Sequence, residues 1–230
     1  MHKDIIVVGA GISGIAAGYN LQKSCPDKSF AILEGRESLG GTWDLFKYPG
    51  IRSDSDMHTL GFRFKPWIHR KSIAGGPSIL EYLNETVDEY DLRKKIIFNQ
   101  KVIASNWVSD KSIWELTIDS NGQQLAMTCN FLFLCGGYYS YDKPYMPDFP
   151  NQDAFKGNLI HPQFWDESMN YEDKKERRDR GAPLPYKSEK SCDLPRSSPL
   201  KKLDNFQIFT SQDVSDNGQK HHISAHTLAL

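Results

Sequence analysis

The sequence predicts an α/β fold with a Rossmann-like nucleotide-binding domain built on a parallel sheet. Residues 4–8 form a short apolar, β-branched run of the kind that is buried on both faces of such a sheet. The segment 9–14 follows directly with the pattern GxGxxG, and apolar residues at helical spacing continue to Leu21. A second apolar run, 29–33, ends at Glu34, twenty residues after Gly14. Strand, glycine-rich turn, helix and strand in this order indicate a dinucleotide-binding unit.

Each glycine of this turn has an expected task. Gly9 permits the tight turn, Gly11 lets the backbone approach a pyrophosphate, and Gly14 lets the helix pack closely on the strand. The helix N-terminus then offers free N–H groups and the positive end of its dipole to the phosphates. A carboxylate at Glu34 accepts hydrogen bonds from a ribose 2′-hydroxyl and repels a 2′-phosphate, which favours FAD or NAD over NADP. The alternative is an ordinary glycine turn followed by a surface glutamate.

The next segments do not continue as an ordinary NAD-binding half. Residues 40–54 read neither as a regular helix nor as a third strand, and a further apolar run follows at 131–135. Between them, we expect a small antiparallel β layer. Its expected strands are 96–98, 102–104, 114–118 and 124–128.

Composition limits the classes of function. With 230 residues, 39% of them hydrophobic, the chain can form one large domain or two small ones. A net charge of −1 removes the whole-chain electrostatic argument for nucleic acid, and no apolar run reaches the ~18 residues of a transmembrane helix. The four cysteines lack metal-ligand spacing and are too few for a disulfide scaffold, which favours a reducing, cytoplasmic location. We expect no metal site, because the histidines at 221, 222 and 226 have no ligand partners at suitable spacing.

The charge distribution separates the chain into two parts. Residues 174–202 contain ten lysines and arginines against four acidic residues, together with four prolines and no helical or strand periodicity. We therefore expect a globular domain at 1–173 and a disordered basic and polar tail at 174–230. Use of the basic stretch 174–202 to bind membrane or nucleic acid is the weakest alternative, since Tyr186 is its single interleaved aromatic residue.

Several motifs together resemble class B flavoprotein monooxygenases, which include the Baeyer–Villiger enzymes and the flavin-containing monooxygenases. Besides the glycine turn and Glu34, the family's fingerprint FxGxxxHxxxW is present, and its Trp165 favours the Baeyer–Villiger branch. The resemblance extends from residue 4 to about 173. It rests on Gly40-Gly41-Thr42-Trp43, Tyr48-Pro49-Gly50, Arg52-Ser53-Asp54 and the fingerprint residues Phe155, Gly157, His161, Trp165 and Asp166.

The resemblance implies roles for individual residues. Gly9, Gly11, Ser13 and Gly14 would hold the FAD pyrophosphate, and Glu34 its adenosine ribose. Asp54, with Arg52 and Ser53, would lie near the flavin, where its carboxylate positions the family's active-site arginine or the nicotinamide. Along the flavin side would lie Gly41, Thr42, Trp43, Asp44 and Leu45, and at the adenine end Val102. For Trp43 and Val102, the alternative is an ordinary place in the core.

The implied reaction is an FAD- and NADPH-dependent oxygenation of small ketones or thioether-type compounds through a C4a-peroxyflavin. The flavin carries the difficult chemistry in such enzymes, and the protein excludes water and stabilises developing charge. His161 would couple the FAD and NADPH domains mechanically; the alternative is a half-buried histidine at a domain edge. The resemblance makes no prediction of the oligomeric state.

The resemblance stops where relatives continue with a second glycine motif for NADPH. Residues 176–180 are five consecutive charged side chains, which cannot form a buried central strand. We therefore expect the FAD-binding portion of a monooxygenase, without the NADPH domain or the catalytic arginine, and no NADPH turnover by this chain alone. A non-catalytic or vestigial flavin-binding fragment is the alternative. The tail itself is either a genuine variant or the product of a reading-frame change.

Overall fold

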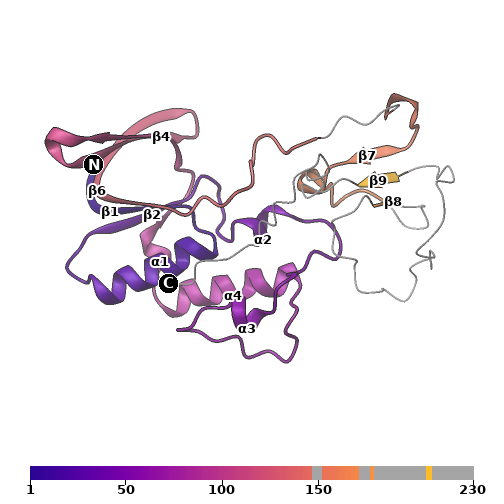
Figure 1. Ribbon diagram of the computed structural model, residues 1–230, viewed down its shortest axis with the longest axis horizontal. Coiled ribbons are helices and arrows are strands. Elements are labelled where there is room, and N and C mark those ends of the chain that lie inside the picture. Colours follow the sequence, from indigo (N-terminus) through magenta and orange to yellow (C-terminus); the bar gives the residue numbers. More distant parts are fainter. Residues whose placement is uncertain (147–151, 171–176, 179–205, 209–230) are drawn as a thin grey trace, which may run out of the picture. The chain divides into compact units, whose positions relative to one another are not determined.

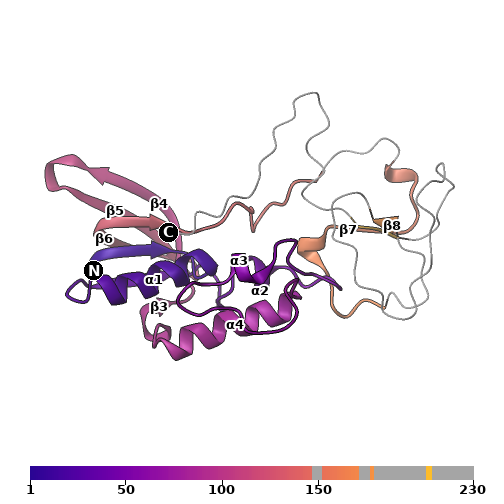
Figure 2. The same ribbon diagram turned by 60° about the horizontal axis from the view of Figure 1, so that its bottom comes forward.

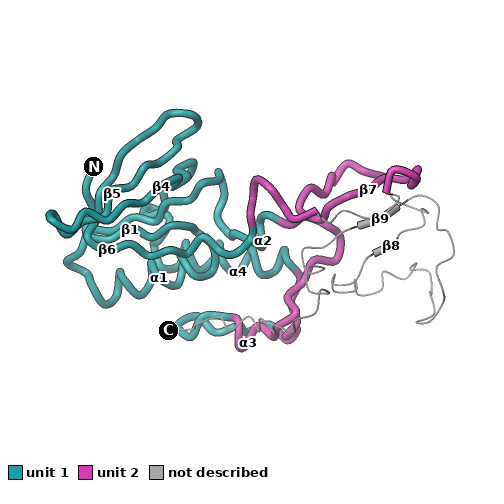
Figure 3. The backbone as a smooth tube through the Cα atoms, turned by 45° about the horizontal axis from the view of Figure 1, so that its top comes forward, with its two compact units in different colours: residues 1–45, 61–69, 76–139 teal, residues 46–60, 70–75, 140–230 magenta. Residues whose placement is uncertain are grey.

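A computed structural model describes residues 1–146, 152–170, 177–178 and 206–208 of the chain. The chain divides into two compact units (Figure 3). Unit 1 comprises residues 1–45, 61–69 and 76–139, and unit 2 comprises 46–60, 70–75 and 140–230. The boundary expected at residue 173 lies outside the described residues and stays a prediction. In the part of the chain that is described, no helix is both long and apolar enough to span a bilayer.

Unit 1 is organised around a six-stranded mixed sheet (Figure 1). The two central strands are parallel to each other, and an antiparallel meander extends the sheet on one side. The first strand of the predicted nucleotide-binding unit therefore lies between the second strand of that unit and the last strand of the meander. In spatial order the strands are β3 (Ile96–Ile97), β2 (Phe30–Leu33), β1 (His2–Val8), β6 (Gln123–Leu134), β5 (Ile113–Ser120) and β4 (Lys101–Val108).

The predicted strand, turn, helix and strand are confirmed. Ile6 and Val7 of β1 are completely buried, as their apolar run predicts for a strand covered on both faces. Helix α1 (Ile12–Ser24) begins directly after the glycine turn and connects β1 to the parallel strand β2. It lies against both strands, and α4 (Gly76–Glu89) lies against α1 (Figure 2).

The antiparallel layer is confirmed for three of its four expected segments. Residues 124–128 and 131–134, expected as two pieces, form the single strand β6. Its first half pairs antiparallel with β5, and its second half pairs parallel with β1. The prediction for 96–98 is wrong, because Ile96 and Ile97 pair parallel with β2. The sequence of such a short apolar run does not show which strand it pairs with. Here the short helix η1 (Arg93–Lys95) directly precedes the run, which pairs at the free edge of β2.

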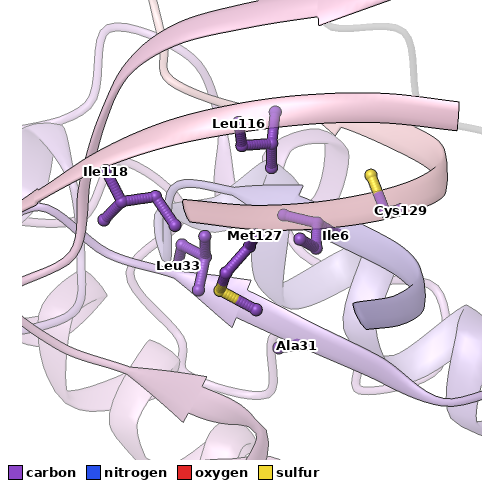
Figure 4. Close-up of a cluster of buried hydrophobic side chains, with 7 residues drawn as sticks. All are labelled: Ile6, Ala31, Leu33, Leu116, Ile118, Met127 and Cys129. Carbon is purple, nitrogen blue, oxygen red and sulfur yellow. The ribbon is translucent and has the colours of Figure 1, made fainter. Parts of the chain in front are cut away.

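A cluster of buried side chains joins the meander to the parallel strands (Figure 4). Complete burial of a large aliphatic side chain stabilises a fold by about 1.5–3 kcal/mol. The cluster therefore fixes β1 and β2, and with them the turn and the carboxylate that follow these strands. Its members are Ile6, Ala31, Leu33, Leu116, Ile118, Met127 and Cys129.

Unit 2 contains short elements only. Its described strands form a three-stranded parallel arrangement in the order β7-β9-β8. Two of these strands fall in the tail that was expected to be disordered; most of that tail lies outside the described residues. The elements are α3 (Met57–Leu60), η3 (Gln152–Ala154), β7 (Asn158–Ile160), η4 (Pro162–Phe164), β8 (Arg177–Arg178) and β9 (Phe206–Ile208).

Candidate functional site

Two glycines of the turn after β1 are required by the packing of the protein itself. Gly9 has φ +100°, and a Cβ on it would lie 2.5 Å from the carbonyl oxygen of Cys135. A Cβ on Gly14 would lie 1.8 Å from the carbonyl oxygen of Gly9. Because both obstacles are backbone atoms, no side-chain movement can relieve these contacts. The tight turn and the close helix contact expected from the sequence are therefore present.

Gly11 differs from its two neighbours in the motif. Its backbone is extended, with φ −79°, and an added Cβ would meet nothing nearer than the Cα of Gly41, at 3.6 Å. That distance is an ordinary van der Waals contact. The fold itself therefore has no need for glycine at this position, whereas a ligand that lies directly on the backbone would need it.

The N-terminus of α1 lies directly after Gly11. Gly11 is the N-cap residue and provides no side-chain hydrogen bond, so the first N–H groups of this 13-residue helix lack both intrahelical and side-chain acceptors. Ser13 is exposed in the first turn. Free N–H groups and the positive end of the helix dipole form a site for an anion such as a pyrophosphate.

Glu34 is buried at the end of β2 and holds the glycine turn from the other side. Its Oε2 accepts the N–H of Ala10 at 2.8 Å, and its Oε1 accepts the N–H of Arg36 at 3.0 Å. The carbonyl of Ala10 in turn accepts the N–H of Gly40 at 3.0 Å. The Glu34 carboxylate thus links the glycine turn to the segment after β2, and its remaining lone pairs can accept hydroxyl groups.

The short helix α2 (Thr42–Leu45) is fixed by polar side chains that the sequence analysis missed. Arg36 forms an ion pair with Asp44 and donates to the carbonyl of Gly41 at 3.3 Å, while Ser38 donates to the same Asp44 carboxylate. Thr42 and Trp43 are half-buried. The sequence shows that Arg36 closely follows Glu34. Its pairing with Asp44 could not be predicted, because it depends on a turn at Gly40 and Gly41 that has no periodic sequence pattern.

Val102 lies in β4 and packs at the edge of the buried cluster. Glu34 lies beside the start of this strand, because the N–H of Gln100 donates to the Glu34 carbonyl at 2.8 Å. Lys101 lies beside Gly35, where an added Cβ would be 3.4 Å from the Lys101 Cβ. Unit 1 therefore places near one end of the sheet the turn residues Gly9, Gly11, Ser13 and Gly14, Glu34, the segment Gly41, Thr42, Trp43, Asp44 and Leu45, and Val102.

Arg52, Ser53 and Asp54 belong to unit 2. Arg52 forms a β-bridge with Gly75, and the N–H of Ser53 donates to the carbonyl of Ala74 at 2.9 Å. The Ser53 hydroxyl is buried and donates to the carbonyl of Ser55 at 2.6 Å. These contacts fix the backbone around Asp54, whose side chain is exposed. Its positioning role stays a prediction.

The fingerprint residues also lie in unit 2, around β7 and η4. Phe155, Gly157 and Trp165 are half-buried, and the exposed Asp166 accepts the N–H and the hydroxyl of Ser168, which lower the pKa of its carboxyl. His161 caps η4 and is buried. Nothing in this segment resembles a metal centre: across the described ranges, histidine, cysteine and acidic side chains form no cluster that could hold a metal ion.

We expect His161 to make the stability of the chain depend on pH. Burial lowers the pKa of its imidazole, whereas in the unfolded chain the group titrates near 6.5. Between these two pKa values the unfolded state binds more protons, so the free energy of unfolding falls as the pH drops below about 6.5. Urea denaturation at pH 8 and pH 5.5 should show this loss in the wild type and a smaller one in His161→Gln. An exposed histidine of the same unit provides the control, His58→Gln, and equal pH dependence in all three proteins would contradict the expectation.

Comparison with known proteins identifies two consecutive families. Residues 7–70 match the NAD(P)-binding Rossmann-like domain, and residues 71–176 match the flavin-binding monooxygenase-like family. The FAD-containing monooxygenase EthA of Mycolicibacterium smegmatis is 53% identical over 174 residues, which are 76% of this chain and 35% of that protein. The probable FAD-binding monooxygenase AlmA of Acinetobacter baylyi is 53% identical over 175 residues, with the same coverage of 76% and 35%. The chain thus spans about a third of the length of these curated relatives.

Solved structures give the same result. The open crystal structure of cyclohexanone monooxygenase superposes with a TM-score of 0.67 at 27% identity, over 77% of this chain and 34% of that one. A crystal structure of OTEMO in complex with FAD and NADP superposes with a TM-score of 0.59 at 31% identity, over 73% and 31%. The resemblance expected from the motifs is confirmed in sequence and in fold. The chain is thus similar to flavin-binding monooxygenases: residues 71–176 match the model of that family, and 76% of the chain aligns with about a third of EthA.

Proposed function

We propose that this chain binds FAD through unit 1 and is the FAD-binding portion of an NADPH-dependent, Baeyer–Villiger-type monooxygenase. The observation that carries the proposal is Gly11. The other two glycines of the motif are explained by the contacts of their own backbone, but an added Cβ at Gly11 meets only an ordinary contact at 3.6 Å. A ligand lying on this backbone explains the glycine, and the uncapped N-terminus of α1 beside it explains why that ligand is an anion.

The residues present fit FAD. The N–H groups at the start of α1 would hold the pyrophosphate, and Glu34 would accept the ribose hydroxyls with the lone pairs that Ala10 and Arg36 leave free. Val102 would border the adenine, and residues 41–45 would follow the cofactor toward its flavin. When bound, the flavin supplies the redox and oxygen chemistry of this family. The share of unit 1 is to bind and orient this group; the role proposed for Asp54, to position the active-site arginine or the nicotinamide, rests on the resemblance to the family.

The substrate belongs to the finer part of the proposal. Among the structural relatives, cyclohexanone monooxygenase has been crystallised with cyclohexanone, and OTEMO with FAD and NADP. We propose small ketones or thioether-type compounds as substrates of the whole enzyme, NADPH as its reductant, and the cytoplasm as its location. The three described cysteines, Cys25, Cys129 and Cys135, are free thiols, in keeping with a reducing compartment.

Cofactor uptake by the purified 230-residue chain tests the FAD assignment. The chain is incubated separately with FAD, FMN and NADP⁺ and then desalted, and the retained ligand is measured by absorbance. We expect FAD to be retained and its visible spectrum to change, because only FAD offers both a pyrophosphate and an unphosphorylated adenosine ribose together with a flavin. A chain that is folded by circular dichroism and retains FMN as well as FAD, or retains no FAD, would contradict the proposal.

A further inference from the structure

Gln163, a buried polar residue of the fingerprint segment, is hydrogen-bonded to the stretch that follows β6. The side-chain amide of Gln163 donates to two backbone carbonyls, those of Ser140 at 2.8 Å and Tyr141 at 2.9 Å. Both amide protons are therefore used, and the Gln163 side chain is nearly inaccessible to solvent. Gln163 thus ties together two stretches of unit 2 that are more than twenty residues apart in the sequence.

The same residue determines where the proton of His161 lies. The backbone N–H of Gln163 donates to Nδ1 of His161 at 3.1 Å. A ring nitrogen that accepts a hydrogen bond carries no proton, so in the neutral imidazole the proton is on Nε2. Burial of the ring also lowers the pKa of His161, which keeps the ring neutral.

Nε2 of His161 is buried, and nothing in the described part of the chain accepts its proton. His161 itself is 5% exposed. Buried donors are almost always paired in folded proteins, and each exception calls for a specific reason. Because Nδ1 is already occupied, the ring can offer one hydrogen bond only, as a donor from Nε2. It has neither a free lone pair with which to act as a base nor the charge of an imidazolium.

We propose that Gln163 is a positioning residue that holds His161 as a neutral Nε2–H donor. The side chain of Gln163 fixes residue 163 against residues 140–141, and its backbone N–H then selects the ring tautomer. The sequence pattern points to His161 and is silent about Gln163, which lies two residues further along. This inference goes beyond the FAD assignment and does not depend on it, since all its atoms lie in unit 2.

The tautomer of His161 can be measured directly. The full chain is prepared with ¹⁵N-labelled histidine rings, and long-range ¹H–¹⁵N spectra are recorded at pH 7, with His161→Asn identifying the signals of His161. We expect a protonated Nε2 and an unprotonated Nδ1 with well-separated nitrogen shifts. In Gln163→Met, which keeps the length of the side chain and removes its donors, the two shifts should converge toward the average of exchanging tautomers. The matched control, Gln152→Met, makes the same change elsewhere in unit 2 and should leave the spectrum unchanged.

Two outcomes would overturn the proposal. One is a wild-type His161 that carries its proton on Nδ1, and the other is a folded Gln163→Met chain with the wild-type tautomer. Should Gln163→Met fail to fold, Gln163→Asn takes its place, because this shorter amide cannot reach both carbonyls from the same backbone position. An unchanged tautomer in Gln163→Asn would then be decisive against the proposal. Flavin binding plays no part in this measurement, so the FAD assignment can fail independently.

Discussion

Replacing Gly14 by alanine should strongly destabilise unit 1, whereas the same change at Gly11 should leave its stability nearly unchanged. The added Cβ at Gly14 would lie 1.8 Å from the carbonyl oxygen of Gly9, which is fixed between β1 and α1. Overpacking a core usually costs about 1–3 kcal/mol, and here the obstacle is backbone that cannot rotate away. We expect a loss of about 3 kcal/mol or more, which is a large share of the ~5–15 kcal/mol by which a domain is normally stable.

Gly11 provides the matched control within the same motif. Its Cβ would lie 3.6 Å from the nearest atom, so the free energy of unfolding of Gly11→Ala should equal that of the wild type to within about 1 kcal/mol. Gly11→Val should also fold but lose FAD, because its side chain occupies the place proposed for the pyrophosphate. Urea denaturation and FAD titration of the three variants measure both effects. The interpretation of the motif fails if Gly14→Ala is as stable as Gly11→Ala, or if Gly11→Val binds FAD normally.

The contrast between these glycines shows how much of the turn could be predicted from the sequence. The pattern GxGxxG after an apolar run predicted the turn, the start of α1 and the close approach of helix and strand, and each is present. Local patterns suffice here because each element is adjacent in sequence to the next. The pattern also assigned Gly9 and Gly14 to the packing of the protein and Gly11 to a ligand. It could not show which atoms an added Cβ would meet at Gly9 and Gly11, because Cys135 and Gly41 meet the turn only in the folded chain.

The elements that the sequence analysis misassigned or left out depend on distant partners. Ile96 and Ile97 look like any short apolar run, and their parallel pairing with β2 follows from the path of the chain through η1. Arg36 and Gln163 are single polar residues without a motif of their own. Their importance comes from backbone carbonyls at Gly41, Ser140 and Tyr141, whose positions are set by turns.

Glu34 has two proposed tasks, and Glu34→Gln should impair both, whereas the same change at an ordinary surface carboxylate should impair neither. Its oxygens accept the N–H groups of Ala10 and Arg36 inside the protein, and its remaining lone pairs are proposed to accept the ribose hydroxyls of FAD. In Glu34→Gln, one oxygen becomes an NH₂ group that faces a backbone N–H. A buried donor that loses its acceptor costs about 1–3 kcal/mol, and we expect the free energy of unfolding to fall by that amount.

FAD affinity should also fall in the same variant, because hydrogen bonds to a charged acceptor contribute about 1.5–3 kcal/mol. This loss corresponds to a dissociation constant that is roughly 10- to 100-fold higher. The control is Glu37→Gln, an exposed carboxylate three residues along the chain, which should change neither quantity. Titration of FAD into each apo-protein and urea denaturation without FAD measure the two effects separately. A Glu34→Gln chain with lower stability but wild-type affinity would restrict Glu34 to holding the turn, and wild-type values for both would remove it from the site altogether. The loss of both quantities together is expected because the carboxylate that would hold the ribose is the same group that holds the glycine turn in place.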